Sequence, residues 1–161
     1  EKNRIKPGIG GGLCNLSNTI HFLVLHSPLT VTEFHSHSDA LAPDEGERVP
    51  FSSGTSVNYN YIDYRFKNNT EQPVQLLVWC ADGNLYAELR SMHPFQYSYR
   101  IVEENHHFQK EGEKYYRISQ IYKETVDKKT GKVLYRNLVL DNHSEVMYDY
   151  SLIPGELIIN D

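Results

Sequence analysis

One cysteine of this chain occupies a position that favours chemical reactivity. Cys14 follows the three glycines Gly10–Gly12 and begins a run of apolar residues spaced by three and four positions. This spacing predicts a helix that starts near Leu13 and buries one face. A thiol in the first turn of a helix lies beside unpaired N–H groups and the positive end of the helix dipole, which favour the thiolate. We therefore predict a nucleophile at Cys14, on a turn whose glycines permit positive φ angles and close approach of another group.

A histidine and two carboxylates further along the chain are candidate partners of this nucleophile. His37 and Asp39 follow the predicted helix, and Asp63 comes later. Papain-like and related peptidoglycan hydrolases share a layout of this kind, with a cysteine at a helix N-terminus, a histidine on a following strand and a third orienting group. In that layout the imidazole takes the thiol proton and the third group orients the imidazole. By this analogy Cys14 is the nucleophile, His37 the base, and Asp63 or Asp39 the orienting group.

Three other interpretations are also open. In the first, the glycine turn exists only for tight packing and Cys14 is a small buried hydrophobe. In the second, His35 and His37 share one face of an extended strand and bind zinc together with Cys14 or Asp39. In the third, the 12 tyrosines and single tryptophan present flat amphipathic faces to a sugar or a peptide stem. No ligand pattern of familiar spacing is present, so we assign neither a metal nor a cofactor.

Composition narrows the class of protein. The 161 residues are enough for one domain with its own core, and 39% hydrophobic and 23% charged residues are typical of a globular chain. The net charge of −5 and the lack of a basic run argue against nucleic acid as a partner. The longest apolar run, Phe22–Leu25, is far shorter than the ~20 residues that a bilayer requires, so we predict no transmembrane segment. Of the two cysteines, Cys80 is expected in the core. The sequence alone does not decide whether Cys14 and Cys80 form a disulfide.

The elements that must position these residues are one helix and a series of strands. Pro28 ends the helical pattern, and a strand is predicted over Thr30–His35. Residues 44–53 have the composition of a loop, and Ile62–Lys67 alternates as a half-buried strand. Further predictions are a hairpin of Val74–Cys80 and Leu85–Leu89 around Asp82-Gly83-Asn84, a strand Tyr97–Val102, a mobile polar loop Glu103–Lys114, and a hairpin of Tyr116–Val126 and Val133–Leu140.

The fold class that follows is α+β, with one N-terminal helix followed by mostly antiparallel β-strands. A break at Met92–Pro94 suggests a boundary between a core of residues 1–92 and a C-terminal β-rich extension of residues 93–161, the latter being a small module or part of the same domain.

The run Gly10–Asn18 resembles the glycine-glycine-glycine-x-cysteine-glutamine-x-serine signature of the VanW family. The stretches Pro28–Thr30, His37 and Ile62–Thr70 follow in the order that this family shows. Tyr116–Leu134 resembles the tail of the version found in vancomycin-resistance clusters. The resemblance therefore spans most of the chain.

The resemblance implies a protein of bacterial glycopeptide resistance or cell-wall maintenance, in the cytoplasm or at the cell envelope. It places Cys14, His37 and Asp63 within motifs, and it implies a binding role for Gly10, Gly11, Gly12, Asn15, Ser17 and His35. The expected function is a cysteine-dependent hydrolase or acyltransferase acting on peptidoglycan-type amides. The alternative is a non-catalytic module that binds cell-wall peptide or glycan, with a structural Cys14. VanW-like proteins have sequence upstream of this motif, so we expect the chain to be truncated at its N-terminus.

Overall fold

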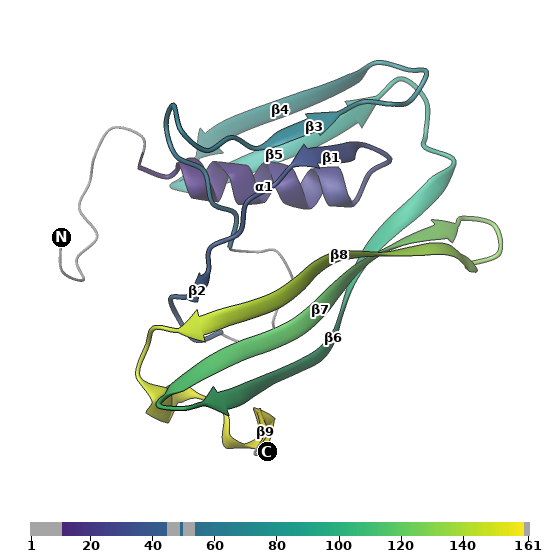
Figure 1. The fold of residues 1–161 in the computed structure, drawn as a ribbon. Coiled ribbons are helices and arrows are strands. Elements are labelled where there is room, and N and C mark those ends of the chain that lie inside the picture. Colours follow the sequence, from purple (N-terminus) through teal and green to yellow (C-terminus); the bar gives the residue numbers. More distant parts are fainter. Residues whose placement is uncertain (1–10, 45–48, 50–53, 160–161) are drawn as a thin grey trace.

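The computed structural model describes residues 11–44, 49 and 54–159, which form one α-helix, two short 3-10 helices and nine strands (Figure 1). The predicted α+β class is confirmed, with an N-terminal helix and mostly antiparallel pairing. In chain order the elements are α1 (Leu13–Leu25), β1 (Thr30–Glu33), β2 (Asp39–Ala40), β3 (Arg65–Lys67), β4 (Val74–Ala81), β5 (Asn84–Ser91), β6 (Tyr97–Glu111), β7 (Lys114–Asp127), β8 (Val133–Val146), η1 (Tyr150–Leu152), η2 (Gly155–Leu157) and β9 (Ile158–Ile159).

The helix begins and ends where local chemistry requires. Gly12 precedes α1 in the left-handed conformation, with φ +88°, which turns the chain into the helix. At the other end the Ser27 hydroxyl donates to the Val24 carbonyl at 2.7 Å, and Pro28 follows. The inner face of α1 buries His21, Val24 and Leu25, so the helix is held by packing rather than by its own length.

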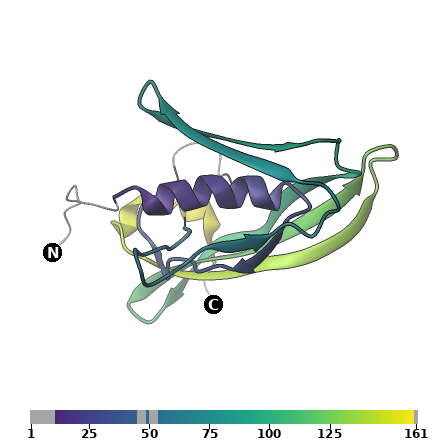
Figure 2. The ribbon, with the colours of Figure 1, turned by 90° about the horizontal axis from the view of Figure 1, so that it is seen from above.

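The strands form three separate sheets around this helix. β6, β7 and β8 make a long antiparallel sheet, to which β2 and β9 add as short parallel strands at its two edges. β4 pairs with β5, and β1 pairs with β3, both antiparallel. In Figure 2 the two small sheets flank α1 on opposite sides, and in Figure 1 the long sheet lies below α1. Leu25, the last residue of α1, packs on Ile121 of β7.

Two turns confirm the predicted hairpins. Asp82 and Gly83 both have positive φ, 50° and 75°, as a two-residue turn between twisted strands requires. The β7–β8 turn is closed by the Asp127 carboxylate, which accepts hydrogen bonds from the backbone N–H of Lys129 and from the N–H and hydroxyl of Thr130. These bonds lower the pKa of Asp127.

Two expectations are wrong. The predicted polar loop at Glu103–Lys114 is strand: β6 runs to Glu111, β7 starts at Lys114, and Gly112 makes the turn at φ 63°. A bulge near Asn105, at φ 53°, interrupts the pairing of β6 with β7 only locally. Cys80 is exposed rather than buried, because the β4–β5 hairpin is covered by a helix on one side only.

Two further points concern predicted boundaries. The predicted loop at 44–53 lies outside the described residues, apart from Asp44 and Val49. The boundary at Met92–Pro94 stays a prediction. The strand β2 lies before this boundary in the chain. It pairs with Glu145 and Val146 of β8, a strand that lies after the boundary.

One edge of the long sheet is open over most of its length. β8 pairs with β2 only at residues 145–146, and no other strand in the described part of the chain pairs with its outer edge. This open stretch of β8 carries exposed apolar side chains, among them Leu134, Tyr135 and Leu138.

We predict that Gly12→Ala lowers the free energy of unfolding by about 1 to 2 kcal/mol, because alanine at φ +88° is strained although its Cβ would meet no atom within 4 Å. Urea denaturation measures this loss. Gly155→Ala is the matched control, since that glycine has an ordinary φ and equally open space around its Cβ. Equal losses in both variants would contradict the role given to Gly12.

Candidate functional site

Cys14 lies in the first turn of α1 as predicted, and its side chain is half-buried. Its Sγ donates a weak hydrogen bond to the carbonyl of Val57 at 3.5 Å. The main-chain N–H of His37 bonds to the Gly54 carbonyl at 2.7 Å, and the side chain lines a cavity that Cys14 does not line. In the described structure no hydrogen bond or ion pair joins Cys14, His37 and Asp63 to one another.

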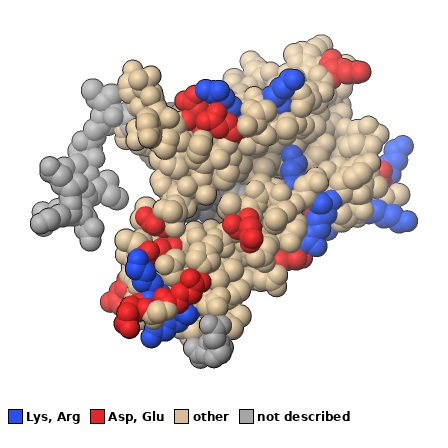
Figure 3. All heavy atoms as spheres, in the orientation of Figure 1, with Lys and Arg blue, Asp and Glu red and all other residues tan. Residues whose placement is uncertain are grey.

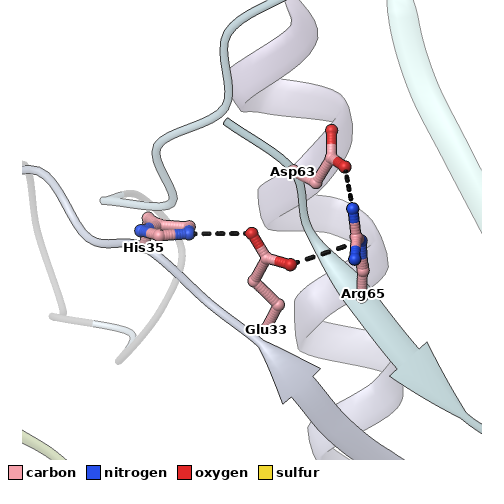
Figure 4. A network of polar contacts seen from close by, with 4 residues as sticks. All are labelled: Glu33, His35, Asp63 and Arg65. Carbon is pink, nitrogen blue, oxygen red and sulfur yellow. Dashed lines mark hydrogen bonds and ion pairs between the residues drawn. The ribbon is translucent and has the colours of Figure 1, made fainter. Parts of the chain in front are cut away.

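Asp63 belongs instead to a surface network that also contains His35 (Figure 4). Its carboxylate pairs with Arg65 at 2.6 Å, Arg65 pairs with Glu33 at 3.2 Å, and Glu33 accepts from His35 at 3.0 Å. The two carboxylates raise the pKa of Arg65. Because these side chains are largely exposed, solvent screens the pairs and they contribute little to stability.

The other motif residues shape the start of α1. Gly10 lies outside the described residues, and Gly11, Gly12 and Asn15 are exposed. Ser17 is buried, as is its neighbour Asn18, whose side-chain oxygen accepts the Thr55 N–H at 2.7 Å. That bond ties the helix to a segment 37 residues away, and the sequence analysis did not anticipate it.

The zinc interpretation finds no support in the geometry. Within residues 11–44, 49 and 54–159, no three side chains of histidine, cysteine, aspartate or glutamate lie close enough together to hold a metal ion. His35 is hydrogen-bonded to the Glu33 carboxylate. The strand β1 ends at Glu33, before the two histidines, so it does not align His35 and His37 on one face.

Two cavities lie between the helix layer and the long sheet, where Figure 3 shows a hollow across the molecule. The first, here called the His37 cavity, has a volume of about 320 Å³. Its polar walls come from α1, from the segment after β1 and from the long sheet: Asn18, Ser36, His37, Asp39, Arg117, Asn142 and Ser144.

Arg117 of β7 is the most deeply buried cation of this cavity, at 8% exposure. Its Nη2 donates to Ala42 O at 3.3 Å and to the Tyr148 hydroxyl at 3.2 Å, and it pairs with Asp44 at 3.4 Å. Its Nε is buried without a hydrogen-bond partner in the described part of the protein. A buried guanidinium with an unused N–H donor can bond a ligand oxygen.

The second cavity, here called the Lys123 cavity, has a volume of about 440 Å³ and is lined by Lys123 of β7 and His21 of α1. His21 is fully buried, stacks on Phe34 at 4.4 Å, and shares a hydrogen bond of 3.0 Å with the Tyr64 hydroxyl. Burial, and secondly the charge of Lys123, lower the pKa of His21 to about 4. Burial also raises the pKa of Tyr64, so both groups are neutral at pH 7.

We predict that His21 makes stability depend on pH between 6.5 and 4. The folded pKa of about 4 lies below the ordinary value of 6.5, so the unfolded chain binds more protons in this window. The free energy of unfolding therefore falls as the pH drops, by at most about 3 kcal/mol from this group.

Urea denaturation of the wild type and His21→Gln from pH 7 to pH 4 measures the effect, since glutamine does not titrate. The difference between the two proteins should shrink or reverse toward pH 4. His93→Gln, at an exposed histidine, is the control and should follow the wild type. A constant difference between His21→Gln and the wild type across the window would overturn the assignment.

Comparison of the sequence with known protein families identifies the family to which this chain belongs. Residues 1–90 match the family model described as VanW like protein, which is more than half of the chain. The chain therefore belongs to the VanW family, and the resemblance noted in the sequence is confirmed.

Two relatives have sequences similar to this one. The Vancomycin B-type resistance protein VanW of Enterococcus faecalis is 22% identical over 139 residues, which is 86% of this chain and 50% of that protein. The protein YoaR of Bacillus subtilis is 27% identical over 90 residues, 56% of this chain and 28% of that protein. The chain thus spans half or less of the length of these relatives. No solved structure matches it. In the described part, no helix has the length and apolar character needed to cross a bilayer.

Proposed function

We propose that this VanW-family chain is a non-catalytic module that binds a cell-wall peptide in the His37 cavity, with Cys14 as a structural residue. The observation that carries the proposal is the composition of that cavity, which places a buried guanidinium beside several neutral donors and acceptors. The name of the Enterococcus relative, a vancomycin resistance protein, is consistent with a ligand from the cell wall.

The walls of the cavity suit a peptide better than an apolar ligand. Peptide groups need donors and acceptors along their length, and Ser36, Asn142 and Ser144 offer both. Charges of both signs are also present, because Asp39 and Asp44 line the same cavity as Arg117. A peptide with a free carboxylate or a side-chain ammonium could therefore bind without leaving its charge unpaired.

A structural role for Cys14 agrees with its surroundings. Its Sγ is half-buried and bonded to the Val57 carbonyl, which holds the start of α1 against the segment after Gly54. That segment also carries Thr55, fixed by Asn18 from the next turn of the same helix. The two contacts give the glycine-cysteine motif a packing function that does not require a reactive thiol.

The second candidate is the thiol-dependent hydrolase or acyltransferase, and the observation that favours it is the place of Cys14 in the first turn of α1. In that mechanism Cys14 attacks an amide carbonyl of a peptidoglycan-type substrate while His37, oriented by Asp63, takes the thiol proton. The C–N bond then breaks as His37 returns the proton to the leaving amine, and water or an acceptor amine releases the acyl group from Cys14. This mechanism requires a rearrangement on substrate binding, because Asp63 is held by Arg65.

We predict that the wild type binds a muropeptide with a tetrapeptide stem, and that His37→Gln weakens binding about tenfold because the imidazole lines the cavity. Isothermal titration calorimetry gives the dissociation constants. His93→Gln is the matched control, since His93 is exposed on another part of the molecule. Binding that is unaffected by His37→Gln would remove the His37 cavity as the site.

The role of Cys14 is tested in a Cys80→Ser background, because Cys80 is exposed and would also be alkylated. We predict that Cys14 reacts with iodoacetamide no faster than a free thiol at pH 7, and that Cys14→Ser retains muropeptide affinity. Faster alkylation, together with product release from the muropeptide that Cys14→Ser abolishes, would instead establish the thiol enzyme.

A further inference from the structure

The described lining of the Lys123 cavity contains one lysine ammonium group, that of Lys123. Lys123 lies on β7, and its Nζ donates to the Ser27 carbonyl at 2.6 Å and lies 4.7 Å from the centre of the Tyr99 ring. No aspartate or glutamate in the described residues forms an ion pair with it. An ammonium has three N–H donors, so the carbonyl and the ring face leave one of them for a ligand.

The rest of the cavity is complementary to an apolar body with one negative end. Its described lining has no acidic side chain, and eight of the lining residues are aliphatic or aromatic: Leu25, Pro28, Leu29, Val31, Phe34, Tyr99, Leu138 and Val139. Thr30, Thr125 and Asn137 add neutral hydrogen-bonding groups. The volume of about 440 Å³ is in the range of small-molecule sites.

The electrostatics of the cavity favour an anion over a cation. Burial lowers the pKa of Lys123 to about 8, so the amine is still mostly protonated at pH 7. Its charge is one of the causes that keep His21 neutral in the same cavity. A half-buried cation without a counter-charge is costly, and a bound carboxylate would relieve that cost.

We propose that the Lys123 cavity binds a monocarboxylate with an apolar body, whose carboxylate accepts a hydrogen bond from Lys123. The ligand is either the C-terminal carboxylate of a short apolar peptide or a free aliphatic acid, because both present the same chemistry. The proposal concerns a cavity separate from the His37 cavity and does not rest on the proposed function.

A purely structural role of Lys123 is the competing explanation. Ser27 lies just beyond the end of α1, and a lysine that bonds a carbonyl there also stabilises the helix end. That role predicts a loss of stability on substitution, but it predicts no preference of the protein for acids over their amides. Ligand binding therefore separates the two explanations where stability alone does not.

The test is calorimetry of the wild-type chain with two acids and their uncharged counterparts. The probes are 4-methylpentanoate against 4-methylpentanamide, and acetyl-alanyl-alanine against its C-terminal amide. We expect at least one acid to bind about tenfold or more tightly than its amide. Binding of the dipeptide acid alone identifies a peptide terminus, and binding of 4-methylpentanoate alone identifies a free acid.

Variants then assign the effect to Lys123. Lys123→Met keeps the unbranched stem without the charge and should remove the preference for the acid, whereas Lys123→Arg should keep it. Lys129→Met, at an exposed lysine in the β7–β8 turn, is the matched control and should bind as the wild type does. Equal affinity for acid and amide in the wild type, no binding of either acid at millimolar concentration, or an equal loss in Lys129→Met would overturn the proposal. The comparison of acid with amide needs only the wild type, so it decides even if Lys123→Met does not fold.

Discussion

The architecture depends on the contact between Leu25 at the end of α1 and Ile121 in the middle of β7. Full burial of side chains of this size contributes about 1.5 to 3 kcal/mol each. The contact fixes the distance between the helix and the long sheet, and both cavities lie in the space that this distance leaves. The Nζ of Lys123 bonds the Ser27 carbonyl beside the same contact, so a polar link also ties the two layers. If this packing were lost, neither cavity would keep its walls.

The interface between helix and sheet contains more polar groups than packing alone needs. His21, Arg117 and Lys123 each lose hydration there, and an aliphatic side chain of similar size would avoid that cost. Ionisable groups with displaced pKa values often mark binding or catalytic sites. His21 and Lys123, two groups of this interface with displaced pKa values, both line the Lys123 cavity, which agrees with a role in recognition.

Local patterns in the sequence predicted the elements that local chemistry determines. The spacing of apolar residues after Gly12 predicted α1, and the dipeptide Asp82-Gly83 predicted the β4–β5 hairpin. The strand nature of residues 103–111 could not be predicted, because no apolar alternation marks that stretch and its pairing with β7 supplies the regularity. The sequence pattern does not mark Arg117 and Lys123 as cavity residues, because segments far away in the chain cover them: residues 42–44 and Tyr148 contact Arg117, and Ser27 contacts Lys123. Asp63 stands two residues before Arg65, on the same face of an extended chain, and that neighbour accounts for its ion pair.

The open outer edge of β8 has a consequence for the behaviour of the protein at high concentration. Along residues 133–144 the backbone amides and carbonyls on that side have no partner strand in the described structure, and exposed side chains such as Tyr135 and Leu138 flank them. Such an edge is a template for any extended segment, including the β8 edge of a second molecule. Arg136 of this strand is paired with Glu104 and Glu124 of its own sheet, so its charge does little to oppose that self-pairing. Association through this edge should therefore increase as the protein is concentrated.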